Sequence, residues 1–510
     1  MVARKKLYLI GVDAAPFWLI KRLASDHKMG GFQRFFRQGF LKELTSTVPP
    51  VTAAAWPSIY TGLRPQQHGV IDFIHIDREY TKQLIYYDSQ KHPPFWEILG
   101  EAGIRSLIVT PAMALKLSGN ENVDMITGWP LEPKYSSGSL QKAANKFEFR
   151  GEPEIGVDLD KGVIPIAEGS KMYVKSIEKR AALSRYLIEK NSYDLVFVCF
   201  TETDRIQHYS FNNEKWEQYV APLYEKISEF VEWVVEQSEK KGEEATIMLV
   251  SDHGSQPIYN KFLPNAWLVK NGYAVLKKNI TKARKESAKG SNIDVKRYIT
   301  EKALKMPGRR RLYHLLPGSA KRAIDRMMDD NFTGEERGYV RIKETLDFEM
   351  DRTEAFAAVS FGPCGMIWLN DRRFAKPGIR EEDRKRVKGE IMSKIGKLEG
   401  GDGKRLVKKV FDGQKYYRGG ESIILPDILF LLRENYIVDF TYYSPSTIFM
   451  KPEIYRSGDH TMEGIFGSID IGNEKNVKKL SKKKAQVYNI GPTILRYFGY
   501  RGKESENSLL

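Results

Sequence analysis

Asp252 and His253 are adjacent residues whose side chains can bind a metal ion. They follow directly on Ala245–Val250, an apolar run that predicts a buried strand, and Gly254 behind them predicts a turn. Ligands of open α/β sheets bind at the carboxyl ends of the strands. A carboxylate oxygen beside an imidazole nitrogen suits zinc or manganese, so we predict a metal role for this pair. An ordinary turn is the alternative, because Asp-His-Gly also occurs where no metal binds.

A second pair of the same kind, Asp204 and His208, follows the predicted strand Asp194–Phe200. Residues four apart share one face of a helical turn and can therefore bind one ion. A solvated Asp–His pair on a helix surface is the alternative. The position directly after a predicted strand favours the metal site.

Asp13 and Thr52 add an acid and a hydroxyl group. Asp13 ends the apolar run Leu7–Val12 and precedes a helix predicted to end near Leu23, so it lies at the same sheet edge as Asp252. Prolines before Thr52 favour an extended backbone and alanines after it favour a helix, which places Thr52 at or near a helix N-terminus. The amides there favour an anion and lower the cost of forming an alkoxide, although a plain N-cap is the commoner role of such a threonine.

The fold must bring these residues together. Strands alternate with helices, which predicts the α/β class: a mostly parallel central sheet with helices on both faces. Distant residues then converge along its carboxyl edge, joined by His460 from a turn late in the chain. Three carboxylates, three histidines and a hydroxyl are what a two-metal phosphotransfer site requires, with cations about 4 Å apart. The candidate residues are Asp13, Thr52, Asp204, His208, Asp252, His253 and His460.

Length and composition set the broad class. A chain of 510 residues suits two to three domains or one large α/β domain with insertions, and 41% hydrophobic residues exclude a disordered chain. Two cysteines, Cys199 and Cys364, cannot form a disulfide framework. The apolar run after Met1–Lys6 is too short for a signal peptide or a membrane span. We therefore expect a cytoplasmic protein without a transmembrane segment.

The net charge of +16 is concentrated in Lys277–Met327, which holds sixteen Lys or Arg against four Asp or Glu. Amphipathic pieces joined by Pro-Gly turns predict a basic helical cap inserted at about 277–340. The core is then 1–276, with an insertion over the sheet edge at about 115–170, and 341–510, which completes the metal site. In this last part, strand–helix alternation is expected to resume at Ala355. The cap suits an acidic or phosphorylated partner, or is simply a solvated basic face.

In their order along the chain, the motifs resemble the alkaline phosphatase superfamily, and within it the type I phosphodiesterase/nucleotide pyrophosphatase group. The matches span nearly the whole chain. The main ones are Gly11–Asp13, Pro50–Thr52 with Thr61–Pro65 and His68–Gly69, Asp204–His208, Ser251–Gly254 and Gly458–His460, with weaker support from Met366–Asn370, Leu425–Asp427 and Gly491–Leu495.

The resemblance implies a two-step hydrolase with two divalent metal ions, zinc as in the pyrophosphatase group or manganese as in other branches. The threonine attacks phosphorus and forms a phospho-threonine ester, which is then hydrolysed. By the same resemblance, Asp204, His208 and His460 hold one metal, while Asp13, Asp252 and His253 hold the second, which touches the nucleophile Thr52.

One feature departs from the family pattern. Members of the pyrophosphatase group have an Asn shortly after the His-Gly turn that holds a phosphate oxygen, whereas Gly69 is followed here by Val70–Ile74, without Asn. A backbone N–H near Ala53 is a substitute donor. The departure weakens a nucleotide-specific interpretation.

The sequence thus predicts a phosphodiesterase or nucleotide pyrophosphatase acting on a small phosphate ester or nucleotide. A phosphomonoesterase or head-group phosphotransferase with the same metals is the nearest alternative. A sulfatase fits less well because Thr52 cannot become formylglycine. A basic protein that binds nucleic acid or a membrane surface through Lys277–Met327 is the alternative from another class. That segment lacks interleaved aromatics and leaves the metal ligands unexplained, so we expect no stable nucleic-acid partner.

Overall fold

The computed structural model describes most of the chain outside the basic segment. The described residues are 5–25, 29–85, 87–89, 91–160, 162–212, 214–277, 339–342, 346–359, 362–418, 423–440, 446–452, 456–472 and 475–510.

A central sheet of seven strands organises this part of the chain, in the order β2-β19-β8-β1-β7-β5-β6. Five adjacent strands run parallel: β8 (Ala245–Val250), β1 (Lys6–Val12), β7 (Leu195–Phe200), β5 (Ser106–Val109) and β6 (Val123–Ile126). The antiparallel β19 (Glu463–Ile471) lies between β8 and β2 (Gly39–Thr45). The predicted mostly parallel sheet is confirmed.

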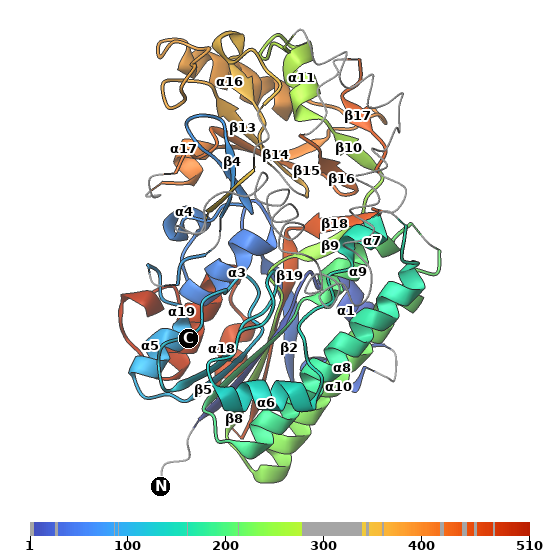
Figure 1. The fold of residues 1–510 in the computed structure, drawn as a ribbon, viewed down its shortest axis with the longest axis vertical. Coiled ribbons are helices and arrows are strands. Elements are labelled where there is room, and N and C mark those ends of the chain that lie inside the picture. The colour runs from blue at the N-terminus through green and yellow to red at the C-terminus, as the bar shows by residue number, and fades with distance from the viewer. Residues whose placement is uncertain are drawn as a thin grey trace, which may run out of the picture.

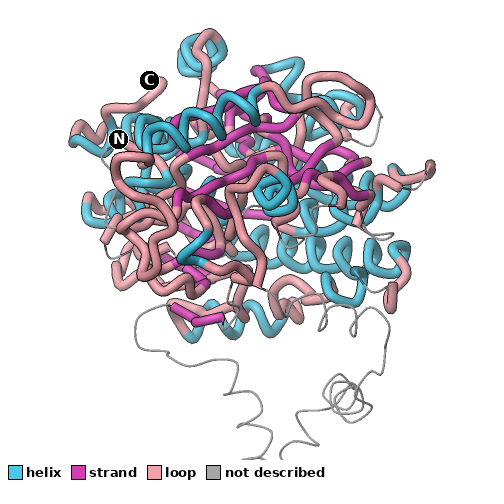
Figure 2. Tube along the Cα trace, turned by 90° about the horizontal axis from the view of Figure 1, so that it is seen from above, coloured by secondary structure: helices cyan, strands magenta, loops and turns pink. Residues whose placement is uncertain are grey.

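Helices cover both faces of this sheet (Figures 1 and 2). Side chains alternate along β1, so Tyr8 and Ile10 enter one apolar core while Leu7 and Leu9 enter the other. The first core is closed mainly by α1 (Phe17–Leu23), α2 (Gly30–Gln38), α6 (Gly138–Lys146), α8 (Ile166–Lys190) and α10 (Glu217–Lys241). The second is closed mainly by α3 (Thr52–Thr61), α5 (Phe95–Glu101), α18 (Lys475–Ser481) and α19 (Ile490–Tyr497).

A separate antiparallel sheet lies above the central one in Figure 1. Its strands are β12 (Ala355–Phe356), β13 (Cys364–Leu369), β15 (Ile428–Leu432) and β14 (Val407–Asp412), with α16 (Arg384–Gly396) packed against them. Strands and helices alternate after Ala355 as expected, but the strands pair antiparallel in a sheet of their own and do not extend the central sheet. Short apolar strands buried on both faces read alike in parallel and antiparallel sheets, so the sequence pattern could not separate them.

Smaller elements connect the two sheets. The hairpin β3 (Ile74–Ile76) and β4 (Lys82–Ile85) pairs with β11 (Tyr339–Ile342), and Ile76 enters the apolar core of the antiparallel unit. That core also includes residues of β10 (Asn260–Phe262), α11 (Pro264–Lys270) and β16 (Tyr436–Val438). Because both halves of the chain supply this core, the second unit is fixed to the first by apolar packing.

Two predicted insertions have different outcomes. The segment at about 115–170 contains β6, an edge strand of the central sheet, so Val123–Ile126 belong to the sheet and the rest of the segment lies outside it. Apart from Lys277 and β11, the predicted basic cap at 277–340 lies outside the described residues. Of the helices that the structure describes, none is long and apolar enough to cross a membrane.

Candidate metal centre

Three neighbouring strands of the central sheet lead to the candidate acids. Asp13 follows β1, and Asp252 and His253 follow β8. Asp204 and His208 lie on α9 (Glu202–Ser210), which begins two residues after β7. Because β8, β1 and β7 are adjacent and parallel, their carboxyl ends meet at one edge and bring these side chains together.

His460 reaches the same edge from β18 (Gly458–Thr461), which pairs with β9 (Gly254–Pro257). Gly458 permits a close approach to α9, because a Cβ at this position would lie 2.1 Å from the carbonyl oxygen of Gln207. The imidazole centroid of His460 lies 4.0 Å from that of His253 and 5.1 Å from that of His208. The late histidine therefore joins the earlier residues.

Thr52 is the first residue of α3, as predicted, and follows Val51 in extended conformation. The first amide groups of a helix have no intrahelical acceptor, so they remain available to an anion. Thr52 is 2% exposed, and its Oγ1 lies 3.2 Å from Nε2 of His253. The hydroxyl is thus brought to the histidine that follows β8.

All three histidines present the same ring nitrogen to the centre. Nδ1 of His208, His253 and His460 lies 2.9, 3.1 and 3.0 Å, respectively, from a backbone carbonyl oxygen. A carbonyl oxygen only accepts hydrogen bonds, so each Nδ1 carries a proton and, in the neutral ring, each Nε2 carries a lone pair. Such a backbone contact is the usual way to orient a metal-binding histidine. The carbonyls belong to Gly458, Gly254 and Pro50.

The lone pairs face carboxylate oxygens. Nε2 of His208 and of His460 lies 3.4 and 3.3 Å from Oδ1 of Asp204. Nε2 of His253 lies 3.2 Å from Oδ2 of Asp252 and 3.7 Å from Oδ1 of Asp13. A lone pair and an anionic oxygen repel each other unless a cation or a proton lies between them. Together with the Thr52–His253 contact and the ring contact between His253 and His460, these contacts link all seven candidate residues.

Asp13 and Asp252 each have one carboxylate oxygen that accepts a hydrogen bond and one that accepts none from the described part of the chain. Asp13 accepts a hydrogen bond from Nε1 of Trp56 at 3.0 Å through Oδ2, and Asp252 accepts one from the amide of Ala14 at 3.3 Å through Oδ1. The other oxygen of each is buried and has no hydrogen-bond partner among the described residues. Buried, unsatisfied acceptors are costly, and a metal ion is one group that satisfies them.

The pKa values of these groups reflect crowded charge. Burial, followed by the negative charge of Asp252, raises the pKa of Asp13 well above its usual range. Burial and the charge of Asp204 raise the pKa of Asp252 to about 7. Although burial opposes it, the contacts with His208 and His460 hold the pKa of Asp204 well below its usual range. Burial lowers the pKa of His253 strongly, which keeps its ring neutral and its lone pair available.

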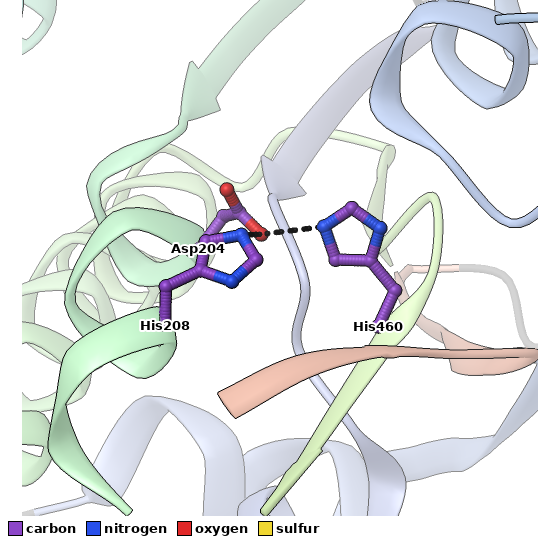
Figure 3. A group of neighbouring side chains, drawn as sticks. All are labelled: Asp204, His208 and His460. Atoms are coloured by element: carbon purple, nitrogen blue, oxygen red, sulfur yellow. Dashed lines mark ion pairs between the residues drawn. The ribbon is translucent and has the colours of Figure 1, made fainter. Parts of the chain in front are cut away.

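Two groups of ligand atoms lie close enough to hold metal ions. Asp204, His208 and His460 form the first, and Figure 3 shows the carboxylate of Asp204 facing both rings. Asp13, Asp204 and His253 form the second. The sequence assigned Asp252 to the second ion in place of Asp204. Asp252 lies beside His253, but the atoms of the second group that are all close to one another come from Asp13, Asp204 and His253. Asp204 therefore belongs to both groups.

A cavity of about 620 Å³ opens beside the first group and includes Thr52 in its lining. Three further wall residues were not identified from the sequence: Trp129, Glu152 and Arg205. Arg205 stands between the two candidate ligands of α9, so its position was a usable signal. Trp129 and Glu152 come from the segment that the sequence predicted as an insertion over the sheet edge, but no pattern singled out these two residues. Apolar and aromatic side chains make up much of the wall: Phe73, Ile74, Trp129, Pro130, Pro153, Tyr173 and Tyr209.

Fold and site together define an enzyme of the alkaline phosphatase type, a hydrolase of phosphoric esters. The family model of type I phosphodiesterase / nucleotide pyrophosphatase matches residues 7–360, and the chain belongs to this family. His460 lies beyond the matched residues, and the pairing of β18 with β9 brings it to the others. A search of curated protein sequences finds no match.

Solved structures with a similar fold include phosphonoacetate hydrolase from Sinorhizobium meliloti 1021 in complex with phosphonoacetate. It is 13% identical with a TM-score of 0.53, and the match covers 96% of this chain and 94% of that one. Murine ectonucleotide pyrophosphatase/phosphodiesterase 5 is 10% identical with a TM-score of 0.49, over 97% of this chain and 95% of that one.

Proposed function

We propose that the protein is a two-metal phosphodiesterase whose nucleophile is Thr52. The observation that carries the proposal is the convergence of three Nε2 lone pairs, carboxylate oxygens of three aspartates and the Thr52 hydroxyl at one sheet edge. Mutual repulsion in this arrangement is relieved by cations, and a histidine–carboxylate set suits zinc or manganese. Two buried groups of ligand atoms support two ions.

The proposed ligands fall into an outer and an inner set. Asp204, His208 and His460 hold the outer ion, and Asp13, Asp252 and His253 hold the inner ion, with Asp204 close to both. When bound, the ions lower the pKa of the threonine hydroxyl and stabilise negative charge on the phosphoryl oxygens.

The chain's own residues then account for the steps. The Thr52 hydroxyl loses its proton, Oγ1 forms a bond to phosphorus, and the bond from phosphorus to the leaving oxygen breaks as that oxygen takes up a proton. Water next cleaves the phospho-threonine ester, which restores the Thr52 hydroxyl and releases a phosphate monoester. The backbone amide near Ala53, in the first turn of α3, is the donor we assign to a phosphoryl oxygen in place of the missing Asn.

The cavity favours a diester over a monoester. Of the described residues in its wall, the two arginines are both compensated: Arg205 donates to Asp204 and Glu152, and Arg456 donates to Asp459. A monoester dianion gains little from compensated charges, whereas a diester carries one charge less. Its second substituent finds apolar and aromatic walls, such as Phe73 and Trp129.

A substrate panel tests this proposal. Metal-depleted protein is supplied with zinc or manganese and assayed with bis-p-nitrophenyl phosphate and p-nitrophenyl phosphate. We expect a higher kcat/KM for the diester, and a preference for the monoester would reject the diesterase assignment. Acid quenching of the reaction with bis-p-nitrophenyl phosphate, followed by peptide mass spectrometry, should detect a p-nitrophenyl phosphoryl group on Thr52. Label on another residue would reject the nucleophile.

A further inference from the structure

Arg205 connects the candidate metal centre to the far wall of the cavity. Its Nη1 donates to Oδ2 of Asp204 at 3.1 Å, and its Nε donates to Oε1 of Glu152 at 3.1 Å. The guanidinium carbon lies 3.9 Å from the ring centroid of Trp129. The hydroxyl of Thr201 donates to the other oxygen of Glu152, which fixes that carboxylate in turn. Two carboxylates and an aromatic face thus hold one planar group.

We propose that Arg205 is a positioning residue that orients Asp204 for both metal ions, an inference that rests on the proposed two-metal function. Asp204 has ligand atoms in both groups, so its orientation affects both ions. By holding Oδ2, Arg205 leaves Oδ1 facing His208 and His460. Groups that hydrogen-bond a metal-ligating carboxylate fix its orientation and tune its affinity for the ion.

The same contacts argue against Arg205 as a cation that binds the substrate. Its single positive charge already meets two carboxylates, and only about one-fifth of the side chain is exposed. A guanidinium that served mainly to attract phosphate would keep its fork available to the anion. Here Nη1 donates to Asp204 and Nε donates to Glu152. Nη2 has no hydrogen-bond partner among the described residues, but it is buried, so the residue acts through Asp204.

Arg205→Met tests this role, because methionine keeps much of the apolar stem over Trp129 and removes the charge. Arg185→Met is the matched control: this guanidinium also stacks on a tryptophan, Trp233, at 5.4 Å, but lies on α8 and donates to the backbone of Glu229. Zinc and manganese are titrated into metal-depleted protein by calorimetry. Thermal unfolding is followed in parallel, and kcat and KM for a diester are measured at saturating metal.

We expect Arg205→Met to weaken metal binding about 10- to 100-fold relative to wild type, with KM for the diester changed less than about 3-fold. Arg205→Lys should recover part of the affinity, because it keeps the charge but not the fork. Glu152→Gln should weaken binding less than Arg205→Met, since Arg205 keeps its bond to Asp204.

Two results would overturn the assignment. Unchanged metal affinity with a KM raised more than about 10-fold would make Arg205 a substrate-binding cation. Equal losses of affinity and thermal stability in Arg205→Met and Arg185→Met would reduce its role to general packing. Normal metal binding by the wild type without diester turnover would refute the proposed diesterase alone, and the calorimetric comparison would still test Arg205. Failure of the wild type to bind metal would refute both.

Discussion

The inner and outer halves of the candidate metal centre differ in which elements position them and in whether they line the cavity. Asp13, Asp252 and His253 follow two adjacent strands and are 0% exposed. Asp204, His208 and His460 lie on a helix and on a short antiparallel ladder, and they line the cavity. A sealed inner set suits activation of a nucleophile, because low dielectric strengthens its electrostatic effect. The outer set lines the cavity that we assign to the substrate.

Thr52→Ala should give the largest effect, because Thr52 links the inner half to the cavity. Turnover of diesters should fall by at least about 10³-fold, as expected when a nucleophile is removed. About two metals per chain should remain bound, measured by elemental analysis of the purified protein. Retained activity would reject the nucleophile, and loss of the metals would make the hydroxyl chiefly a ligand. Thr52→Ser is the control and should keep part of the activity.

The next largest effects should come from removing one ligand from each half, which distinguishes the roles of the two halves. His460→Ala should reduce metal affinity by more than the roughly 10- to 100-fold typical of an outer-shell partner. Asp252→Asn should also weaken metal binding, but it should raise the melting temperature in chelator, because it removes a buried carboxylate crowded by like charge. Calorimetry and thermal unfolding in EDTA provide the measurements. Unchanged metal content in His460→Ala would exclude this histidine as a ligand.

The sequence predicted the inner half of the centre more fully than the outer half. The inner half was accessible because Asp13 and Asp252 directly follow apolar strands, and parallel topology then forces their convergence. His460 was named from the sequence as a histidine in a late turn, but its role as a ligand rested on the family resemblance, since about two hundred residues and a separate antiparallel sheet intervene between it and His253. The cavity wall was not predicted: Trp129 and Glu152 come from irregular chain, where periodicity carries no information about contacts.

For the antiparallel unit, the sequence predicted the strands themselves but not their direction. Apolar runs near Cys364–Leu369 and Pro426–Leu432 were identified, and the structure forms strands there. Strand direction depends on the connections, and the sequence pattern of these runs does not encode it. The cytoplasmic location expected from the sequence stays a prediction; Cys199 and Cys364 are both buried, and no disulfide joins them.

The pH dependence of the free energy of unfolding should report on the two carboxyl groups of the inner half. Folding raises the pKa of Asp252 to about 7, and that of Asp13 well above its usual range, mainly through burial. Between about pH 4 and 7 the folded, metal-free protein therefore binds protons that the unfolded chain has lost. This contribution to the free energy of unfolding is fully present below about pH 4 and is lost as the pH rises through about 7.

Urea unfolding of chelator-treated protein at pH 5 and pH 8 measures this loss. The free energy of unfolding should be lower at pH 8, and Asp252→Asn should flatten the difference because it removes one of the two groups. Added zinc or manganese should restore stability at pH 8, where ionised carboxylates bind the ion best. Equal stability at both pH values in the metal-free wild type would show that the inner carboxylates are not crowded as described.

The smallest expected effect comes from a residue in the wall of the cavity that the outer half lines. It tests whether this wall contacts the second substituent of the diester. Phe73 lines the cavity and packs edge-on against Trp129, with ring centroids 5.7 Å apart. Phe73→Ala should lower kcat/KM for phenyl p-nitrophenyl phosphate about 5-fold, equivalent to about 1 kcal/mol of lost apolar contact. The methyl analogue should be nearly unaffected, because a methyl group reaches less of the wall, and metal affinity should stay at the wild-type value. Phe36→Ala, at an exposed site on α2, is the control. An unchanged phenyl-to-methyl ratio would place the second substituent elsewhere, whereas a changed ratio with intact metal binding would separate recognition in the outer cavity from chemistry in the inner half.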